Sequence, residues 1–478
     1  MDTKKVVKKL KKIFSSEILI NITDKKPYLE DWRKEFFGKA IAVVFPENIN
    51  EIKELIDFAR INKLYLVPQG GNTGLCGGAT PNNNSNNILI SFKKLNKIRS
   101  IDVVSNTIIV ESGCILENIQ NEVDKLSKVF PIDLSSKGSC TIGGNIGTNA
   151  GGNNVIRYGS TRDVVLGIEA VLPNGNIINN LSKPFKDNTE YPFHKLLVGS
   201  EGTLGIISAA KIKLFEKPKA KITVCVQFEK IEMAMEAMYD LKLNLGNDIE
   251  AFELMTKEIL GIIYKHFPRF KKPFSDNPDF IGIIDIITNS KFDLDNYIEN
   301  KTIFENRVLS ILENLINKKI IKNAIIAQSN HQQKQIWEIR ESANIAQGLE
   351  GNVLRHDISL PLNKIIKFWN KTTDELLKKY DQFSICAFGH LGDGNIHFNL
   401  IGNSKDLVFF NENIDVFKEI ILNNVYNLEG SFSAEHGIGQ LKKKELLNYK
   451  DKNIIELMRE IKQSFDPLNI LNPGKIIN

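Results

Sequence analysis

Short apolar segments alternate with an amphipathic stretch in the first 215 residues. Runs rich in Val, Ile and Leu, bounded by turn residues, predict β-strands at 40–45, 64–68, 87–92, 106–113 and 164–178. Residues 48–62 follow Pro46 and repeat their apolar side chains at helical spacing, which predicts a helix. Pro173–Gly175 lies between two apolar runs and predicts a hairpin turn. We therefore expect a first domain of mixed helices and strands.

The pattern changes after residue 215. Residues 215–220 indicate a linker, and beyond them the segments are longer. We expect strands at 222–228 and 279–287 and helices at 231–243 and 297–316. This is typical of a second domain made of a sheet with covering helices. From about residue 430 the chain carries glycine motifs and then a helix, and it ends in an extended tail that Pro467 and Pro473 favour.

Composition excludes several classes of protein. The 478 residues predict two or three domains. With 42% hydrophobic and 25% charged residues the chain is typical of globular proteins and not of disordered ones. No apolar run reaches the roughly 18–20 residues that cross a bilayer. The net charge of +5 comes without an arginine cluster, which argues against a nucleic-acid partner.

The N-terminus and the cysteines bear on location. The odd number of cysteines, five, and the lack of a C-x-x-C pair favour packing roles in a reducing compartment. The lysine-rich first residues lack the continuous apolar stretch of a signal peptide. We expect a cytoplasmic protein, or a mitochondrial matrix protein in a eukaryote. The first residues are interpreted as a helix docked on the body, and a helix on an anionic membrane surface is the alternative.

Three glycine-rich loops are candidates for binding a diphosphate. They lie at Pro68–Pro81, Ser135–Ser160 and Leu196–Ile207. Glycines let several backbone N–H groups converge on phosphate oxygens without interference from side chains. Neither the G-x-G-x-x-G nor the P-loop motif occurs, so the Rossmann and P-loop interpretations lack support. One such loop alone could be a surface loop, but three favour a large cofactor wrapped by several segments.

A second candidate site lies in the second half of the chain. His390 and His397 flank a Gly-Asp-Gly turn, so we expect a hairpin that places them opposite each other. Asn399 should share the strand face of His397. The segment Gly430–Gly439 adds Glu435 and His436. Two histidines and a glutamate leave open positions on a divalent metal, which favours a catalytic metal site over ordinary buried histidines.

Two arginines extend this second candidate site. Arg340 and Asn344 should share one face of a helix at i, i+4 spacing. Arg355 lies beside His356, which could line a pocket. A guanidinium fork suits a carboxylate, although Arg340 could instead pair with Glu338 or Glu341.

The glycine loops resemble the FAD-binding loops of the vanillyl-alcohol oxidase and p-cresol methylhydroxylase type of fold. The His390–Asn399 and Glu435–Gly439 segments and the terminal Asn472–Lys475 resemble its D-2-hydroxyacid dehydrogenase branch. That branch includes D-lactate dehydrogenases, the flavin subunit of glycolate oxidase and, nearest by motif, D-2-hydroxyglutarate dehydrogenases. The resemblance covers the chain from about residue 35 onward.

The resemblance implies an α+β chain with a two-subdomain FAD-binding domain, an α/β cap domain for the substrate and a C-terminal segment that returns to the flavin. The expected boundaries are a helical extension at 1–34, the FAD domain at 35–214, the cap at 215–430 and the C-terminal segment at 431–478.

The resemblance also assigns residues. FAD binding is expected of Pro68, Gly70, Gly71, Asn72, Thr73, Gly74, Leu75, Gly78, Ser139, Thr141, Gly143, Gly144, Asn145, Thr148, Gly151, Gly202, Gly205, Ile206 and Asn472. The expected ligands of a divalent metal, which the resemblance implies to be zinc, are His390, His397 and Glu435. The substrate would meet Arg340, Asn344, Arg355, Asn399 and His436, with His436 as general base. Asn344 and Arg355 stand where the family usually has threonine and lysine.

The expected function is oxidation of a D-2-hydroxy acid, D-2-hydroxyglutarate first, by FAD with a metal. The FAD should be non-covalent, because no histidine lies in the Pro68–Pro81 loop. Electrons would leave to oxygen, a quinone or an electron-transfer flavoprotein, and a homodimer is compatible with the sequence. The alternatives are a D-lactate or glycolate dehydrogenase or oxidase, another flavin chemistry such as that of an alcohol oxidase or ether-lipid synthase, and a non-catalytic flavin subunit.

Overall fold

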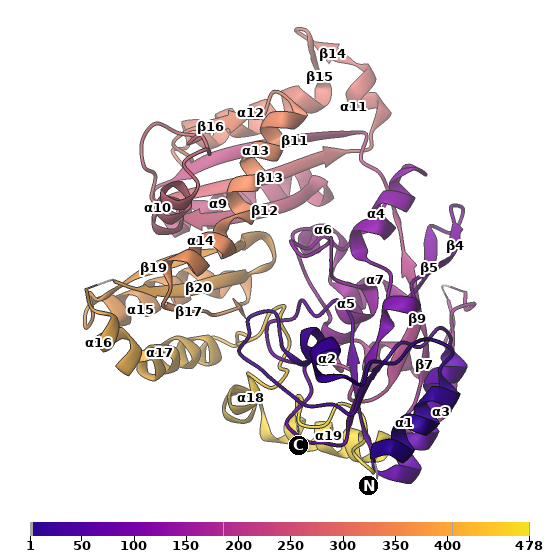
Figure 1. Ribbon diagram of the computed structural model, residues 1–478. Coiled ribbons are helices and arrows are strands. Elements are labelled where there is room, and N and C mark those ends of the chain that lie inside the picture. Colours follow the sequence, from indigo (N-terminus) through magenta and orange to yellow (C-terminus); the bar gives the residue numbers. More distant parts are fainter. Residues whose placement is uncertain (1–2, 185, 404, 478) are drawn as a thin grey trace. The chain divides into compact units, whose positions relative to one another are not determined.

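The computed structural model describes residues 3–184, 186–403 and 405–477, and Figure 1 labels its helices and strands where there is room. The chain divides into two compact units. Unit 1 contains the described residues up to Gly152, then Tyr158–Glu216, and then the chain from Glu435 onward. Unit 2 contains Asn153–Arg157 and Lys217–Ala434. The C-terminal segment thus belongs to the same unit as the glycine loops.

Unit 1 is built on two main sheets. The first is parallel, in the order β1-β3-β2, and consists of β1 (Ala42–Val44), β2 (Tyr65–Gln69) and β3 (Asn87–Ser91). The second is antiparallel, in the order β4-β5-β9-β7-β8, and consists of β4 (Ile98–Asp102), β5 (Thr107–Glu111), β7 (Val165–Val171), β8 (Ile177–Asn179) and β9 (Ile206–Lys213). A short pair joins β6 (Lys128–Val129) to β10 (Phe215–Glu216). The predicted hairpin joins β7 to β8, and Gly175 takes the positive φ of 85° that its turn requires.

Several helices accompany the sheets of unit 1. They are α1 (Thr3–Ile13), α2 (Ile22–Leu29), α3 (Ile49–Asn62), α4 (Leu116–Asp124), α5 (Ile142–Thr148), α7 (Thr161–Val164), α8 (Phe193–Leu197), α18 (Lys443–Tyr449) and α19 (Lys452–Phe465). Helix α1 buries Val6, Leu10 and Ile13 in the same core as Ile52 of α3. Its apolar face therefore packs on the body, as expected, rather than facing a membrane surface. Among the described residues no helix is both long enough and apolar enough to span a bilayer.

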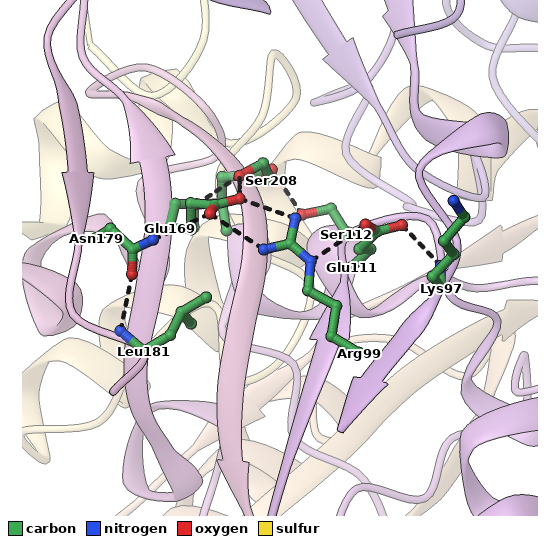
Figure 2. A network of polar contacts seen from close by, with 9 residues as sticks. Lys97, Arg99, Glu111, Ser112, Glu169, Asn179, Leu181 and Ser208 are labelled. Carbon is green, nitrogen blue, oxygen red and sulfur yellow. Dashed lines mark hydrogen bonds and ion pairs between the residues drawn. The ribbon is translucent and has the colours of Figure 1, made fainter. Parts of the chain in front are cut away.

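A network of charged groups crosses the antiparallel sheet of unit 1 (Figure 2). The Arg99 guanidinium donates to both carboxylate oxygens of Glu169, at 3.1 and 2.9 Å, and to Glu111 at 3.1 Å. The Ser208 hydroxyl donates to Glu169 at 2.7 Å. Burial raises the pKa of Glu169, but these hydrogen bonds, chiefly that from Arg99, outweigh it and lower the pKa below its usual value. The network ties β4, β5, β7 and β9 together beside the candidate cofactor loops.

Unit 2 is built on one antiparallel sheet. Its order is β16-β11-β13-β12-β19-β20-β17, with β18 also pairing with β20. The strands are β11 (Ala220–Phe228), β12 (Ile249–Thr256), β13 (Phe280–Thr288), β16 (Ala324–Ile326), β17 (Val353–Leu354), β18 (Ile358–Ser359), β19 (Phe383–His390) and β20 (Asn395–Gly402). The central strands are buried along their whole length, because helices cover both faces.

One face of this sheet packs on α10 (Lys257–His266), α13 (Asn330–Glu341) and α14 (Ala343–Glu350), through a core that includes Met255, Ile283 and Phe388. The other face meets aromatic side chains of α15 (Ile365–Leu377), where Phe368 and Trp369 pack on Phe398. The remaining helices of unit 2 are α9 (Ile231–Leu245), α11 (Lys291–Asp295), α12 (Ile303–Asn317), α16 (Leu407–Glu412) and α17 (Ile414–Asn427). The short α6 (Val155–Tyr158) begins in unit 2 and ends at the first residue of the following part of unit 1.

Two sequence predictions were wrong in detail. Residues 297–302 form a small hairpin of β14 (Tyr297–Ile298) and β15 (Lys301–Thr302) instead of the start of a helix. Helix α12 begins only after Thr302, whose side chain forms a capping box with Glu305. The helix predicted through Arg340 and Asn344 breaks at Ser342, whose hydroxyl donates to the Ile339 carbonyl at 2.8 Å.

Candidate active site

The predicted FAD-binding loops meet one another within unit 1. A Cβ at Gly71 would lie 2.0 Å from the Ser139 carbonyl oxygen, and one at Gly70 would lie 2.4 Å from the Thr141 hydroxyl. Gly202, at φ +70°, lies against the ring of Pro68. The glycines therefore allow three chain segments, far apart in sequence, to pack backbone against backbone.

The C-terminal segment joins the same loops. The buried Glu201 carboxylate accepts hydrogen bonds from the N–H groups of Ile438 (2.7 Å) and Gly439 (2.9 Å). The Asn472 amide donates to the Gly78 carbonyl at 3.0 Å and to the Glu201 carbonyl at 2.8 Å. An isolated bridge between Leu66 and Leu471 lays the extended tail beside β2. Asn472 thus lies with the glycine loops, as part of a shared cradle, and its role in FAD binding stays a prediction.

Polar atoms in this cradle fit a polar cofactor. The Thr141 hydroxyl, the Asn472 Oδ1 and the Lys475 Nζ are buried and have no hydrogen-bond partner among the described residues. Buried polar groups are normally satisfied, so these atoms suit a ligand rich in acceptors and donors. Burial lowers the pKa of Lys475 to about 8, against the opposing attraction of Glu201. The dinucleotide of FAD supplies anionic and hydrogen-bonding groups of this kind.

The other predicted cofactor residues occupy the same segments of unit 1. Gly74 would carry a Cβ with no described heavy atom within 4 Å, and Asn72 takes a positive φ of 55°. Thr148 donates to the Gly144 carbonyl at 3.2 Å, and Gly143 packs on Ser112. The remaining predicted residues lie in these loops or at the start of β9, namely Thr73, Leu75, Ser139, Asn145, Gly151, Gly205 and Ile206.

The predicted histidine pair lies on β19 and β20 of unit 2. Phe388, not His390, is directly opposite His397 in the antiparallel register. His390 lies two residues further along the same face, and the two imidazole rings are 6.0 Å apart between centroids. The histidines are therefore diagonal neighbours and not opposite each other, because the 391–393 turn begins directly after His390. Both are buried, and Asn399 shares their face.

His390 has a fixed partner on the neighbouring strand. Glu253 of β12 lies directly opposite His390 in the β12–β19 register, and its Oε1 is hydrogen-bonded to the His390 Nδ1. With Nδ1 committed to a carboxylate, Nε2 is the nitrogen that a metal would take. Two imidazoles on one face are donors of the type that zinc prefers, and Glu435 is the carboxylate expected to complete the set. The donor set in this part of the chain fits the expected metal.

Arg340 is also held by Glu253. The Arg340 Nε donates to the Glu253 Oε2 at 2.6 Å, and the guanidinium carbon lies 4.7 Å from the centroid of the Phe388 ring. None of the described residues accepts a hydrogen bond from the Nη groups of Arg340. Burial raises the pKa of Glu253, but Arg340 and His390 outweigh it and lower the pKa to about 2. Arg340 is therefore paired with a residue of the sheet and not with Glu338 or Glu341, the alternative partners that the sequence offered.

The other predicted substrate residues differ in their surroundings. Asn399 accepts from the His356 N–H at 2.9 Å and donates to the Gln347 Oε1 at 2.9 Å, so its amide is engaged within unit 2. Arg355 is half-buried near α14. Asn344 is exposed while Arg340 is buried, so the expected shared helix face does not occur. The break at Ser342 turns Gln347 inward in its place.

Glu435 and His436 begin the last segment of unit 1. The Glu435 Oε1 accepts a hydrogen bond from the Gly152 N–H at 2.7 Å. Gly152 has a φ of +110°, and a Cβ there would lie 2.0 Å from the Asp133 carbonyl oxygen. One residue earlier, the Ala434 N–H donates to the Asp357 carbonyl of unit 2 at 3.1 Å. His436 is half-buried in this glycine-rich segment.

Sequence reasoning missed Glu253, Gln347 and Lys475. Only Glu253 carried a usable signal, because a carboxylate with apolar neighbours in a strand must have a buried partner. None of the five cysteines forms a disulfide among the described residues, and all five are buried, as expected of packing residues. In Cys114, Cys225 and Cys386 burial raises the pKa of the thiol.

Comparisons with known proteins cover nearly the whole chain. A family model described as "FAD linked oxidases, C-terminal domain" matches residues 217–476, and one described as "FAD binding domain" matches 40–180. The mitochondrial D-2-hydroxyglutarate dehydrogenase of Arabidopsis thaliana is 33% identical over 463 residues, which are 96% of this chain and 79% of that protein. A putative mitochondrial D-lactate dehydrogenase of Schizosaccharomyces pombe is 32% identical over 457 residues, which are 94% of this chain and 84% of that protein.

Among solved structures, p-cresol methylhydroxylase with substrate bound matches with a TM-score of 0.77, covering 99% of this chain and 97% of that chain at 14% identity, which concerns the fold alone. Fold and cradle together define a flavoenzyme with the p-cresol methylhydroxylase type of FAD-binding fold. The chain belongs to the FAD-linked oxidase family, and its similarity extends to relatives named D-2-hydroxyglutarate and D-lactate dehydrogenases. The resemblance drawn from the motifs is thereby confirmed.

Proposed function

We propose that this enzyme oxidises a D-2-hydroxy acid to the 2-oxo acid and prefers D-2-hydroxyglutarate to D-lactate or glycolate. The observation that carries the proposal is the linked arrangement of Arg340, Glu253 and His390 in unit 2. It holds a guanidinium, suited to a carboxylate, beside a histidine suited to a metal. The names of the relatives support the same reaction class.

Two groups would complete the site. FAD would be held without a covalent bond by the glycine loops and the C-terminal segment, and when bound it accepts two electrons and a proton as hydride from the substrate carbon. A divalent ion, zinc by its donor set, would be held by His390, His397 and Glu435, and when bound it lowers the pKa of a coordinated hydroxyl.

The chain's own residues bind the substrate and move its proton. His436 is the proposed general base and takes the proton of the 2-hydroxyl, because a neutral imidazole titrates near working pH. Arg340 and Arg355 are the proposed partners of the distal carboxylate, and Asn399 is a further proposed substrate residue. Asn344, which is exposed and does not share the face of Arg340, is not retained in the proposed set. Arg340 already has an anion in Glu253, so its burial does not by itself indicate a diacid. Its two Nη groups keep the geometry of a fork, which supports a diacid substrate.

Anaerobic flavin bleaching tests the proposal. Purified holoenzyme would be mixed without oxygen with D-2-hydroxyglutarate, D-malate, D-lactate and glycolate, with L-2-hydroxyglutarate as the stereochemical control. We expect the D-diacids to bleach the flavin absorbance fastest and the L-enantiomer to leave it unchanged. Fastest bleaching by D-lactate would contradict the substrate preference. Failure of every acid to bleach would support a non-catalytic flavin subunit instead.

The electron acceptor is proposed to be a quinone or an electron-transfer flavoprotein. Reduced enzyme would be mixed with oxygen, with a soluble quinone, or with an electron-transfer flavoprotein, and flavin absorbance would be followed in time. Faster recovery with quinone or flavoprotein than with oxygen is expected, and recovery fastest with oxygen would identify an oxidase.

A further inference from the structure

Unit 2 contains a continuous line of three buried charged or polar groups. Glu253 has no exposed surface, and each of its carboxylate oxygens takes one partner, Arg340 at Oε2 and His390 at Oε1. The three residues come from α13, β12 and β19. A carboxylate at the centre of a sheet is costly unless it is fully paired. Both partners, Arg340 and His390, are residues that the sequence predicts for the candidate active site.

The register of the sheet fixes this contact. Glu253 and His390 form a direct cross-strand pair of β12 and β19, and Met255 faces Phe388 one step further on the same face. Strand pairing holds Cβ atoms of opposite residues about 4.5–5.5 Å apart, so the carboxylate reaches the imidazole without backbone movement. The contact selects the tautomer with hydrogen on Nδ1 and orients the ring.

The second oxygen of Glu253 orients Arg340. It engages the Nε, on the inner side of the guanidinium, while Phe388 covers the guanidinium plane at 4.7 Å. The outer Nη groups are thereby held in one plane and one direction. A bidentate contact with a carboxylate requires that both Nη groups, or one Nη and Nε, be presented in the plane of the carboxylate.

We infer that Glu253 is a positioning residue of the active site, which fixes the imidazole of the metal ligand His390 and the guanidinium of the substrate-binding Arg340 through one carboxylate. The inference rests on the proposed function for the identity of the ion and the substrate. A carboxylate behind a ligating histidine makes the imidazole a stronger ligand and holds its orientation. One residue would then couple the affinity for metal to the affinity for a diacid.

Three variants separate positioning from folding. Glu253→Gln keeps the shape and removes the charge, Arg340→Met removes the arginine alone, and the double variant removes both charges. Glu253→Gln leaves the Arg340 charge buried without its partner, whereas the double variant removes both charges. The thermal unfolding temperature of the double variant should therefore be closer to that of the wild type than the unfolding temperature of Glu253→Gln is. Each is measured as purified holoenzyme for FAD content, for zinc affinity by competition with a chromophoric chelator, and for kcat and KM.

We expect Glu253→Gln and the double variant to lose about 10–100-fold in zinc affinity, the usual effect of removing such a partner. Arg340→Met should keep the wild-type zinc affinity and raise KM for D-2-hydroxyglutarate more than it lowers kcat. Wild-type zinc affinity in both Glu253→Gln and the double variant would make the cluster a structural ion pair and overturn the inference. Absence of zinc binding by the wild-type enzyme would overturn the proposed metal instead, and the two failures are thereby distinguished.

Discussion

His390 and His436 differ in their surroundings in a way that matches different roles. His390 is buried in a sheet and hydrogen-bonded to a carboxylate. His436 is half-buried in a glycine-rich segment, next to Glu435. A metal ligand needs a fixed ring and a committed second nitrogen, whereas a general base needs access to the proton that it removes.

Replacement of His436 should affect the chemical step more than binding. We expect His436→Ala to lower kcat by about 10²–10⁴-fold, the usual contribution of a general base. The zinc content and the spectral change of the flavin on binding substrate should persist. His390→Ala is the matched control and should lose zinc. Metal analysis of both variants checks the assignment, which would be reversed if His436→Ala lost the metal and His390→Ala kept it.

Arg355 should distinguish a diacid from a monoacid. A hydrogen bond to a charged group contributes roughly 1.5–3 kcal/mol, so Arg355→Met should cost D-2-hydroxyglutarate about 10- to 100-fold in kcat/KM and cost D-lactate little. Arg355→Lys keeps the charge and should recover most of the loss. Steady-state kinetics with both acids decide the question, and equal losses for both would reject a distal carboxylate site at Arg355.

At the scale of elements, the cofactor cradle depends on how closely its loops approach. The Pro68–Pro81 loop lies against the backbone at Ser139, where Gly71 leaves no room for a Cβ. Gly74, three residues later, has open space around it among the described residues. Two glycines of one loop therefore have different physical requirements.

We expect Gly71→Ala to lower the thermal unfolding temperature of FAD-free enzyme and to weaken FAD binding, because its methyl group would lie 2.0 Å from the Ser139 carbonyl oxygen. Gly74→Ala should leave the unfolding temperature of FAD-free enzyme near that of the wild type. Thermal unfolding with and without FAD checks both. Equal unfolding temperatures for the two FAD-free variants would show that the loops do not pack as described.

The Arg99 network should make the stability of unit 1 depend on pH. The folded pKa of Glu169 lies below its unfolded value, so the pair stabilises fully above about pH 5 and loses its effect as pH falls through the folded pKa. Some solvent reaches Arg99, and we expect Arg99→Met to cost about 1–2 kcal/mol at pH 7 and less near pH 4. Urea unfolding at both pH values measures this. Lys125→Met, which removes an exposed pair with Glu122, should cost less than about 1 kcal/mol and should not show the same dependence on pH.

At the scale of the whole molecule, the two candidate groups depend on largely different residues. The predicted FAD-binding residues all lie in unit 1, whereas His390 and His397 lie in unit 2. Glu435, the third proposed metal ligand, lies in unit 1 and accepts a hydrogen bond from the Gly152 N–H. None of the three proposed ligands is a predicted FAD-binding residue, so removal of a metal should leave the FAD cradle intact.

Chelator treatment should abolish turnover while the flavin spectrum remains, and added zinc should restore activity. Turnover and the flavin spectrum are measured before and after dialysis against the chelator. Full activity of verified metal-free enzyme would contradict the proposed metal.

Acid precipitation should release the yellow FAD into the supernatant, because no covalent attachment is expected. The absorbance of the supernatant and of the pellet measures this. Colour that stays in the pellet would indicate covalent attachment, with Cys76 as the residue to examine.

The sequence was sufficient to predict the cofactor class, and it indicated the segments that are proposed to carry the chemistry. Glycine loops have strict local requirements for backbone conformation, so Gly71 and Gly202 could be assigned from the pattern. The alternation of side chains on a strand likewise placed His397 and Asn399 on one face, as β20 confirms. These are properties of neighbouring residues, which a sequence displays directly.

Only the tertiary structure decided which distant residues meet. Strand register brought Glu253 opposite His390, across 137 positions of chain. The helix break at Ser342 turned Asn344 outward and Gln347 inward. The Glu201 contacts joined the C-terminal tail to the glycine loops. Such contacts follow from the packing of whole elements, whose energies sum over many residues, so no local pattern in the sequence specifies them.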